Sequence, residues 1–189
     1  MEEGNVHHHD RKQRFEVIYV AHYADILAYI RRRTTSPEDA ADALAETFTT
    51  AWRRLDDLPQ GPDARLWLFG VARRVLANGR RAESRRGELV ERLGRQLAVW
   101  AEHTEVREDL ADVREAFARL SPDDREVLAL AGWEGLGSDE IATVLGCSRP
   151  NARLRLHRAR KRLAKHLDAA GIDLARIGLR AVAMTRGIL

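Results

Sequence analysis

A helix–turn–helix pattern at residues 138–166 constrains this chain more than any other feature. A short segment with helical spacing ends at Gly146, and a second helical segment follows it. From Arg149 to Lys165 this second segment carries eight basic residues and no acidic one. In proteins that join two helices in this way, the second helix fits the major groove of DNA. We therefore expect residues 149–165 to face a polyanion, and DNA is the first candidate.

Length and charge distribution bound the remaining possibilities. With 189 residues, of which 44% are hydrophobic, the chain can form one ordinary domain or two small ones. The net charge is only +3, so the positions of the charges are more informative than their sum. Acidic residues concentrate at 36–57 and 102–126, and basic residues at 73–86 and 149–165. This segregation predicts a cation-facing side and a separate anion-binding side.

Cys147 is the single cysteine, so an intramolecular disulfide is excluded and a reducing compartment fits the chain. It lies in the turn of the predicted helix–turn–helix, where we expect a small, partly buried side chain with a structural role. No apolar stretch is long enough to span a bilayer. The N-terminus lacks the basic and apolar regions of a signal peptide. We therefore expect a cytoplasmic protein.

Helical periodicity accounts for most of the chain, and no β-strand pattern is convincing. A first group of helices is expected at 14–33, 37–55 and 64–81. The turn residues Pro59–Pro62 separate the last two of these helices. Ser36 is the predicted N-cap of the second helix, because a proline and an acidic residue follow it at the favoured positions.

A second group of helices begins near Asp109. Ser121 opens one of them with the same Ser-Pro signature. Ser138 and Ser148 are the predicted N-caps of the two helices in the helix–turn–helix. The buried face of the last helix should consist of apolar residues three or four positions apart, namely Ala152, Leu156, Ala159, Leu163 and Leu167.

The fold class that follows is all-α, with two small helical domains joined by a flexible linker. The expected parts are a disordered N-terminal segment, a first domain, a linker, a second domain and a C-terminal extension, at 1–11, 12–81, 82–108, 109–168 and 169–189. For the charged and glycine-interrupted linker, a fourth helix of the first domain is the alternative. The extension is apolar with three arginines, which suits a packed helix, a frayed tail or a regulatory contact.

Three spaced motifs carry a family resemblance. They are DALAETFTTAWR at 42–53, LWLFGVARR at 66–74, and a longer pattern at 120–160 that includes LSP, REVL and the helix–turn–helix. In this order they resemble the extracytoplasmic-function (group IV) sigma factors of bacterial RNA polymerase, which belong to the sigma-70 family. The resemblance extends over roughly residues 12–168, and three motifs in family order are more specific than any one alone.

The resemblance implies an alternative sigma factor with three sets of functional residues. The expected partner sites on core RNA polymerase are the β′ clamp helices and the β flap. The residues expected to bind the polymerase lie on the second helix: Asp39, Asp42, Glu46, Phe48 and Trp52. Recognition of the −10 promoter element falls to Gln60, Asp63, Arg73, Arg74, Arg80 and Arg81. Recognition of the −35 element falls to Arg149, Asn151 and Arg153 near the bases, and to Arg155 and Arg158 at the backbone.

Several positions depart from the family pattern. Ala45, Arg74 and Leu154 stand where the family often has Gln, Asn and Ser, and the loop at 59–63 differs from the usual sequence. These differences bear on the promoter sequence more than on binding to the polymerase. The resemblance also implies an anti-sigma factor as a further partner, with no membrane span in the chain itself.

Plainer interpretations stand beside these assignments. The acidic residues of the second helix suit a solvated face, with Phe48 and Trp52 in the core. Trp67 could offer a stacking surface to a base, but its place in the apolar stripe favours a core position. The run His7–His9 has metal-binding residue types, yet its terminal position favours a disordered segment, so we expect no metal or other cofactor. No nucleophile–base pair or phosphate-binding glycine loop is recognisable, and we expect no enzyme activity.

Two other classes of function remain open. One is an autonomous helix–turn–helix regulator that binds an operator without polymerase, usually as a symmetric dimer. The other is an adaptor or anti-sigma-like interaction protein that binds partners through its acidic helices. Basic segments in both domains favour the sigma factor over either alternative.

Overall fold

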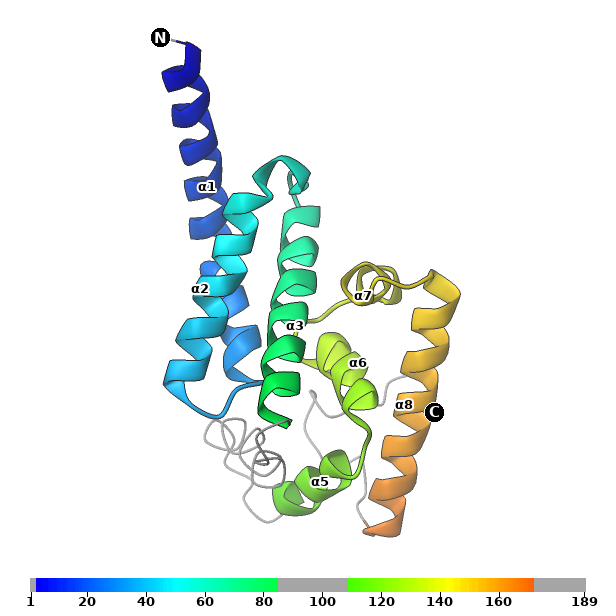
Figure 1. Ribbon diagram of the computed structural model, residues 1–189. Helices are drawn as coiled ribbons and strands as arrows, with labels where there is room; N and C mark the ends of the chain where they lie inside the picture. The colour runs from blue at the N-terminus through cyan, green and yellow to red at the C-terminus, as the bar shows by residue number, and fades with distance from the viewer. Residues whose placement is uncertain (1–2, 85–108, 172–189) are drawn as a thin grey trace. The chain divides into compact units, whose positions relative to one another are not determined.

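The computed structural model describes residues 3–84 and 109–171, and every regular element in these ranges is helical (Figure 1). The chain divides into two compact units, Met1–Leu89 and Val90–Leu189. Within the described ranges, the all-α expectation is confirmed. No described helix is long and apolar enough to cross a membrane.

In the described part of the first unit, α1 (Glu3–Arg31), α2 (Pro37–Arg53) and α3 (Asp63–Ser84) pack against one another. A 3₁₀ turn, η1 (Leu55–Asp57), follows α2. The core is built from residues of all three helices and of η1, and its fully buried members include Ile26, Tyr29, Ile30, Leu55, Leu68 and Phe69. The expected helix at 37–55 is thus shorter than predicted, because Leu55 already belongs to the 3₁₀ turn.

Local capping explains where α2 begins. The Ser36 hydroxyl oxygen accepts a hydrogen bond from the Asp39 backbone N–H at 3.0 Å, and a proline stands in the first turn. This confirms the predicted N-cap. Within this helix Ala40 is buried, whereas Ala41 is exposed. The buried positions follow the spacing 40, 43, 44, 47, 48 and 51, which turns position 41 toward solvent.

The second unit centres on α8 (Arg149–Ala169), which packs against α5 (Asp109–Ala118), α6 (Pro122–Gly132) and α7 (Ser138–Leu145). Its predicted apolar stripe is confirmed, since all five residues are buried: Ala152, Leu156, Ala159, Leu163 and Leu167. Gly146 ends α7 with φ +64°, a left-handed conformation that favours glycine and makes the tight turn before α8.

The N-cap of α7 differs from the prediction. Gly137, not Ser138, is the N-cap residue, and its backbone N–H donates to Glu140 Oε2 at 2.7 Å. A glutamate three residues after Gly137 satisfies this donor from its side chain, so the helix begins at Ser138, one residue earlier than an N-cap at Ser138 would give. Ser148 is the N-cap of α8 as predicted, although its side chain makes no capping hydrogen bond.

The prediction of disorder at 1–11 was wrong for the described residues 3–11, which form the first turns of α1. Two side chains of α1 bind the segment that follows α2: Arg11 binds Asp56, and Arg14 binds the Leu58 backbone oxygen. Of the predicted linker, residues 82–84 belong to α3, and 85–108 lie outside the described residues. The side chains of the His7–His8 pair and the extension from residue 172 onward also lie outside them.

Candidate nucleic-acid and polymerase interfaces

The basic face of α8 is exposed in the second unit. The buried stripe occupies one side of the helix, and the side chains assigned to the −35 element all lie in exposed positions: Arg149, Asn151, Arg153, Arg155 and Arg158. An exposed arginine can donate several hydrogen bonds to a guanine edge or a phosphate, and asparagine can pair with adenine. This arrangement has the chemistry needed to bind duplex DNA along the helix.

One of these arginines is already paired within the unit. Arg149 Nη2 lies 3.2 Å from Asp139 Oδ2 in the first turn of α7, and both side chains are largely exposed. An exposed pair of this kind contributes little to stability. It leaves Arg149 free to exchange its carboxylate for a phosphate or a base.

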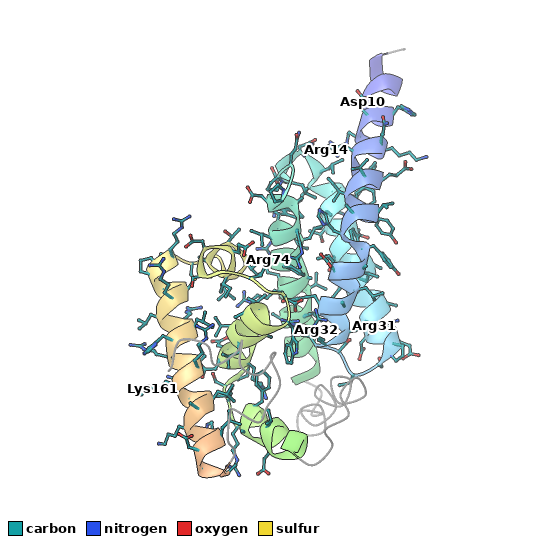
Figure 2. All side chains as sticks on the ribbon, turned by 180° about the vertical axis from the view of Figure 1, so that it is seen from behind. Asp10, Arg14, Arg31, Arg32, Arg74 and Lys161 are labelled. Carbon is teal, nitrogen blue, oxygen red and sulfur yellow. The ribbon has the colours of Figure 1, made fainter. Side chains whose placement is uncertain are left out.

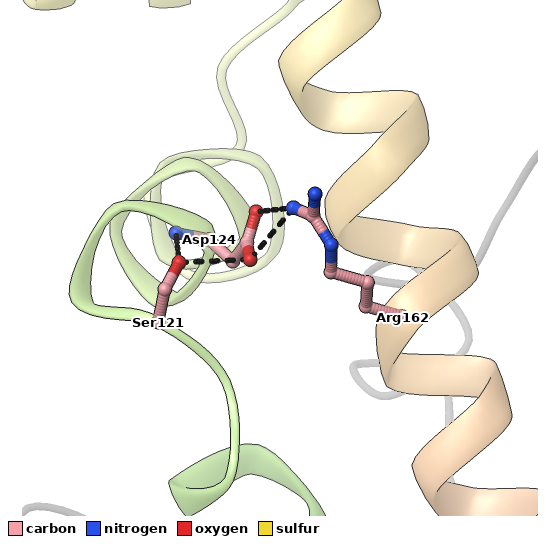
Figure 3. Close-up of polar contacts among 3 residues, drawn as sticks. All are labelled: Ser121, Asp124 and Arg162. Atoms are coloured by element: carbon pink, nitrogen blue, oxygen red, sulfur yellow. Dashed lines mark hydrogen bonds and ion pairs between the residues drawn. The ribbon is translucent and has the colours of Figure 1, made fainter.

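A buried carboxylate fixes α8 to α6 (Figure 3). Arg162 Nη1 donates to both carboxylate oxygens of Asp124, at 2.7 and 2.9 Å. The Ser121 hydroxyl donates to Asp124 Oδ2 at 2.8 Å and accepts from the Asp124 backbone N–H at 3.1 Å. Asp124 is only 7% exposed, whereas the Arg162 side chain is 56% exposed. These bonds position α8 on α6.

This group corrects one expectation and adds a residue. Residues 149–165 were expected to face a polyanion, but Arg162 within this segment binds Asp124. The sequence pattern assigned Asp124 only to the start of a helix. Its bond to Arg162 was not predicted, because the two residues are 38 positions apart. No local signal distinguished Asp124, because an acidic residue three positions after Ser121 already belongs to the N-cap signature.

The residues assigned to core polymerase divide into two groups on α2. Asp42 and Glu46 are exposed and Asp39 is half-buried, so their carboxylates line an accessible edge. Phe48 is only 5% exposed and packs on α1, with its ring 4.6 Å from that of Tyr19. The plainer interpretation of Phe48 is therefore correct, and this side chain supports the edge from inside.

Trp52 lies at the margin of the same packing. Its half-buried ring is 5.3 Å from that of Phe15, and the Arg11 guanidinium is 5.8 Å from the ring centroid. Trp67 is also half-buried, with the Arg54 guanidinium 5.8 Å from its ring. Neither tryptophan is a fully buried core residue.

The residues assigned to the −10 element lie on α3 and on the loop before it. Gln60 and Asp63 are exposed beside Gly61, whose φ of +65° makes the turn. On α3, Arg74 is exposed and Arg73 is half-buried (Figure 2). Arg80 and Arg81 lie in the last turns of α3, but their side chains are outside the described set.

Two arginines of α1 bind the segment that leads into this loop, and no sequence pattern predicted these contacts. Arg14 Nη2 donates to the Leu58 backbone oxygen at 2.6 Å (Figure 2). Arg11 Nη1 lies 2.6 Å from both carboxylate oxygens of Asp56. The partners are 44 and 45 positions apart. We call Arg11 and Arg14 the α1 brace.

His22 of α1 is half-buried, and its charged neighbours are Asp25 of the same helix and Arg65 of α3. Burial is the main cause that lowers its pKa, with the Arg65 guanidinium adding to this and Asp25 opposing it. Arg65 Nε donates to Asp25 Oδ2 at 2.7 Å, which ties the two helices together. Within the described residues, no group of histidine, cysteine or carboxylate side chains could hold a metal ion.

Comparison with known proteins places these two units in one family. Sigma-70 region 2 matches residues 18–86, and sigma-70 region 4 matches residues 110–163. The RNA polymerase sigma factor CnrH of Cupriavidus metallidurans is 33% identical over 162 residues, which cover 79% of this chain and 85% of that protein. The ECF RNA polymerase sigma factor SigL of Mycobacterium tuberculosis is 28% identical over 158 residues, or 82% of this chain and 89% of SigL.

A solved structure agrees with the sequence comparison. The sigma factor RpoE of Bartonella quintana, crystallised in complex with the anti-sigma factor NepR, gives a TM-score of 0.55 at 25% identity. The match covers 84% of this chain and 97% of that one. The chain therefore belongs to the sigma-70 family, as an extracytoplasmic-function RNA polymerase sigma factor.

Proposed function

We propose that this chain binds core RNA polymerase and directs initiation at promoters with a −10 and a −35 element. The observation that carries the proposal is the pairing of two family regions, one in each unit, with an exposed basic recognition helix in the second. In this account the protein performs no chemical step and needs no cofactor, because the polymerase supplies the reaction. It acts in the cytoplasm, where the chromosome and the polymerase are.

We assign recognition of the −35 element to the exposed face of α8. Arg149, Asn151 and Arg153 stand in the first turns, the part of a recognition helix that reaches base edges. Arg155 and Arg158 follow at the level expected for phosphates. Each phosphate contact adds about 0.9 to the slope of log affinity against log salt concentration. Replacing Arg158 by alanine should lower that slope by about one while leaving sequence preference unchanged.

The loop before α3 and the exposed part of α3 are assigned to the −10 element. Opening a duplex requires that bases leave the stack, at a cost of about a few kcal/mol per base, so contacts to a captured base must offset that cost. Gln60 and Asp63 can form hydrogen bonds with a base, and Arg73 and Arg74 can neutralise phosphates beside it. The same role is proposed for Arg80 and Arg81.

We assign binding of the β′ clamp helices to the acidic edge of α2. Exposed carboxylates at Asp42 and Glu46 lie one turn apart and can pair with basic groups on a partner helix. Phe48 and Trp52 hold the edge against α1 and contribute indirectly. The B. quintana relative was crystallised with an anti-sigma factor, and an antagonist of that class is proposed as a further partner, alongside the β flap.

An autonomous operator-binding regulator is the competing function, because a helix–turn–helix alone suits either role. Run-off transcription with purified bacterial core polymerase on promoter-bearing genomic fragments separates the two. We expect specific transcripts only when the protein is added, and the mapped starts give both promoter elements. Tight, specific duplex binding by the protein alone, without new transcripts, would contradict the proposal and support the regulator.

A further inference from the structure

One apolar side chain interrupts the basic face of α8. Leu154 is 45% exposed, and it is the only large hydrophobic residue exposed among the described residues of the second unit. A single exposed leucine is ordinary on a protein surface and needs no explanation by itself. Its position on the recognition helix is what carries information.

Leu154 lies at the centre of the exposed face. Ala152 and Leu156, two positions to either side, are both buried, and at 3.6 residues per turn this puts Leu154 opposite the buried stripe. Asn151 and Arg158 stand three positions before it and four positions after it, so all three share one surface. A helix that presents this surface to the major groove presents the leucine with it.

A leucine can neither donate nor accept a hydrogen bond, so it cannot read amide, amino or carbonyl groups of a base. The one apolar group that the major groove displays is the C5-methyl group of thymine. We propose that Leu154 is a specificity-determining residue that reads a thymine methyl group within the −35 element. This inference rests on the proposed function, in which α8 contacts that element.

Deoxyuridine differs from thymidine only by the methyl group, so it tests the contact directly. The full-length chain is combined with core polymerase, and the −35 element of a mapped promoter receives deoxyuridine in place of each thymidine, one at a time on both strands. Affinity is measured by competition against the unmodified promoter. With the wild-type protein, one replacement should reduce affinity about fourfold, the value expected when burial of a single methyl group is lost.

The variants place the effect at Leu154. L154A should respond to that same replacement by less than about 1.5-fold, and L154M, which keeps an apolar side chain of similar size, should respond like the wild type. R158A is the matched control, since it should bind more weakly to every template yet keep the full deoxyuridine response. Equal melting temperatures of L154A and the wild type would show that the exposed position is not needed for folding.

Three results would overturn the inference: no thymine whose replacement matters to the wild type, an L154A response equal to that of the wild type, or a −35 element without an A·T pair. Each of these can occur while the holoenzyme still makes promoter-specific transcripts. Failure of transcription itself would instead contradict the proposed function, so the two failures are distinguishable.

Discussion

The two units hold their DNA-facing elements in different ways. In the second unit, α8 is fixed by the buried carboxylate of Asp124, which binds Arg162 and the Ser121 hydroxyl. In the first unit, the segment before α3 is held by the α1 brace, whose Arg11–Asp56 pair is largely open to solvent. A buried charge that loses its partner is costly, whereas an exposed pair contributes at most about 1 kcal/mol. We therefore expect α8 to be fixed more firmly on its unit than the segment before α3 is on α1.

The largest effect is expected from Asp124→Ala, which removes the acceptor shared by Ser121 and Arg162. We expect the second unit to lose about 2 kcal/mol of its free energy of unfolding, less than a fully buried pair because Arg162 is half exposed. Hydrogen exchange in α6 and α8 at increasing urea concentrations measures this loss. R158A is the control and should unfold like the wild type. A D124A variant of unchanged stability would contradict the claim that the buried Asp124 carboxylate fixes α8.

A smaller effect is expected from Arg14→Ala. The variant loses one charged hydrogen bond to the Leu58 carbonyl, worth about 1.5 kcal/mol. Hydrogen exchange should speed up at residues 58–63 but not in α8, and the holoenzyme should open promoters more slowly at unchanged core affinity. R14K, which can still donate, should retain part of the wild-type behaviour. Protection unchanged across the loop would show that the brace does not position it.

The Arg11–Asp56 pair should matter less than Arg14. A double-mutant cycle with R11A and D56A is expected to give a coupling energy of about 0.5 kcal/mol at low salt, which falls as salt screens the exposed charges. Thermal unfolding at two salt concentrations measures it. A coupling energy larger than the D124A effect would contradict the claim that the buried Asp124 contributes more than the exposed pair. A coupling energy that salt leaves unchanged would contradict the claim that the pair is open to solvent.

The smallest expected effect concerns His22 and acid. Burial lowers the pKa of this histidine in the folded state. Below about pH 6.5, the ordinary pKa of histidine, His22 is therefore protonated more fully in the unfolded chain than in the folded one. Stability of the first unit should therefore decline as the pH falls through this range, and His22→Gln should remove part of the decline. Unfolding curves at pH 7.5 and 5.5 test this, and a variant with the same pH dependence as the wild type would contradict it.

Sequence periodicity predicted the local features of both units. The buried stripe of α8 and the N-caps at Ser36 and Ser121 follow from residues close in sequence, and hydrogen bonds at both serines confirm the caps. Two local predictions differ from the structure. Glu140 binds the Gly137 backbone N–H and makes Gly137 the N-cap of α7 in place of Ser138. The polar residues at the start of the chain gave no indication that residues 3–11 belong to α1.

Long-range partners could not be predicted from the same patterns. The bonds from Arg11 and Arg14 to the segment after α2, and from Arg162 to Asp124, join residues 38 to 45 positions apart. Periodicity shows which side of a helix is buried, but it does not show which charge on another helix lies opposite. The assignment of Phe48 to the polymerase came from the family resemblance, whereas the helix pattern placed it in the core, where it packs on α1.

Footprinting of the holoenzyme on a mapped promoter tests most directly the claim that the two units read separate elements. Hydroxyl-radical protection should cover both elements with the wild type, only the −10 region with an Arg155→Ala, Arg158→Ala double variant, and only the −35 region with an Arg73→Ala, Arg74→Ala double variant. Loss of both footprints together in each double variant that still binds core polymerase, or full protection by the protein without core polymerase, would contradict the account.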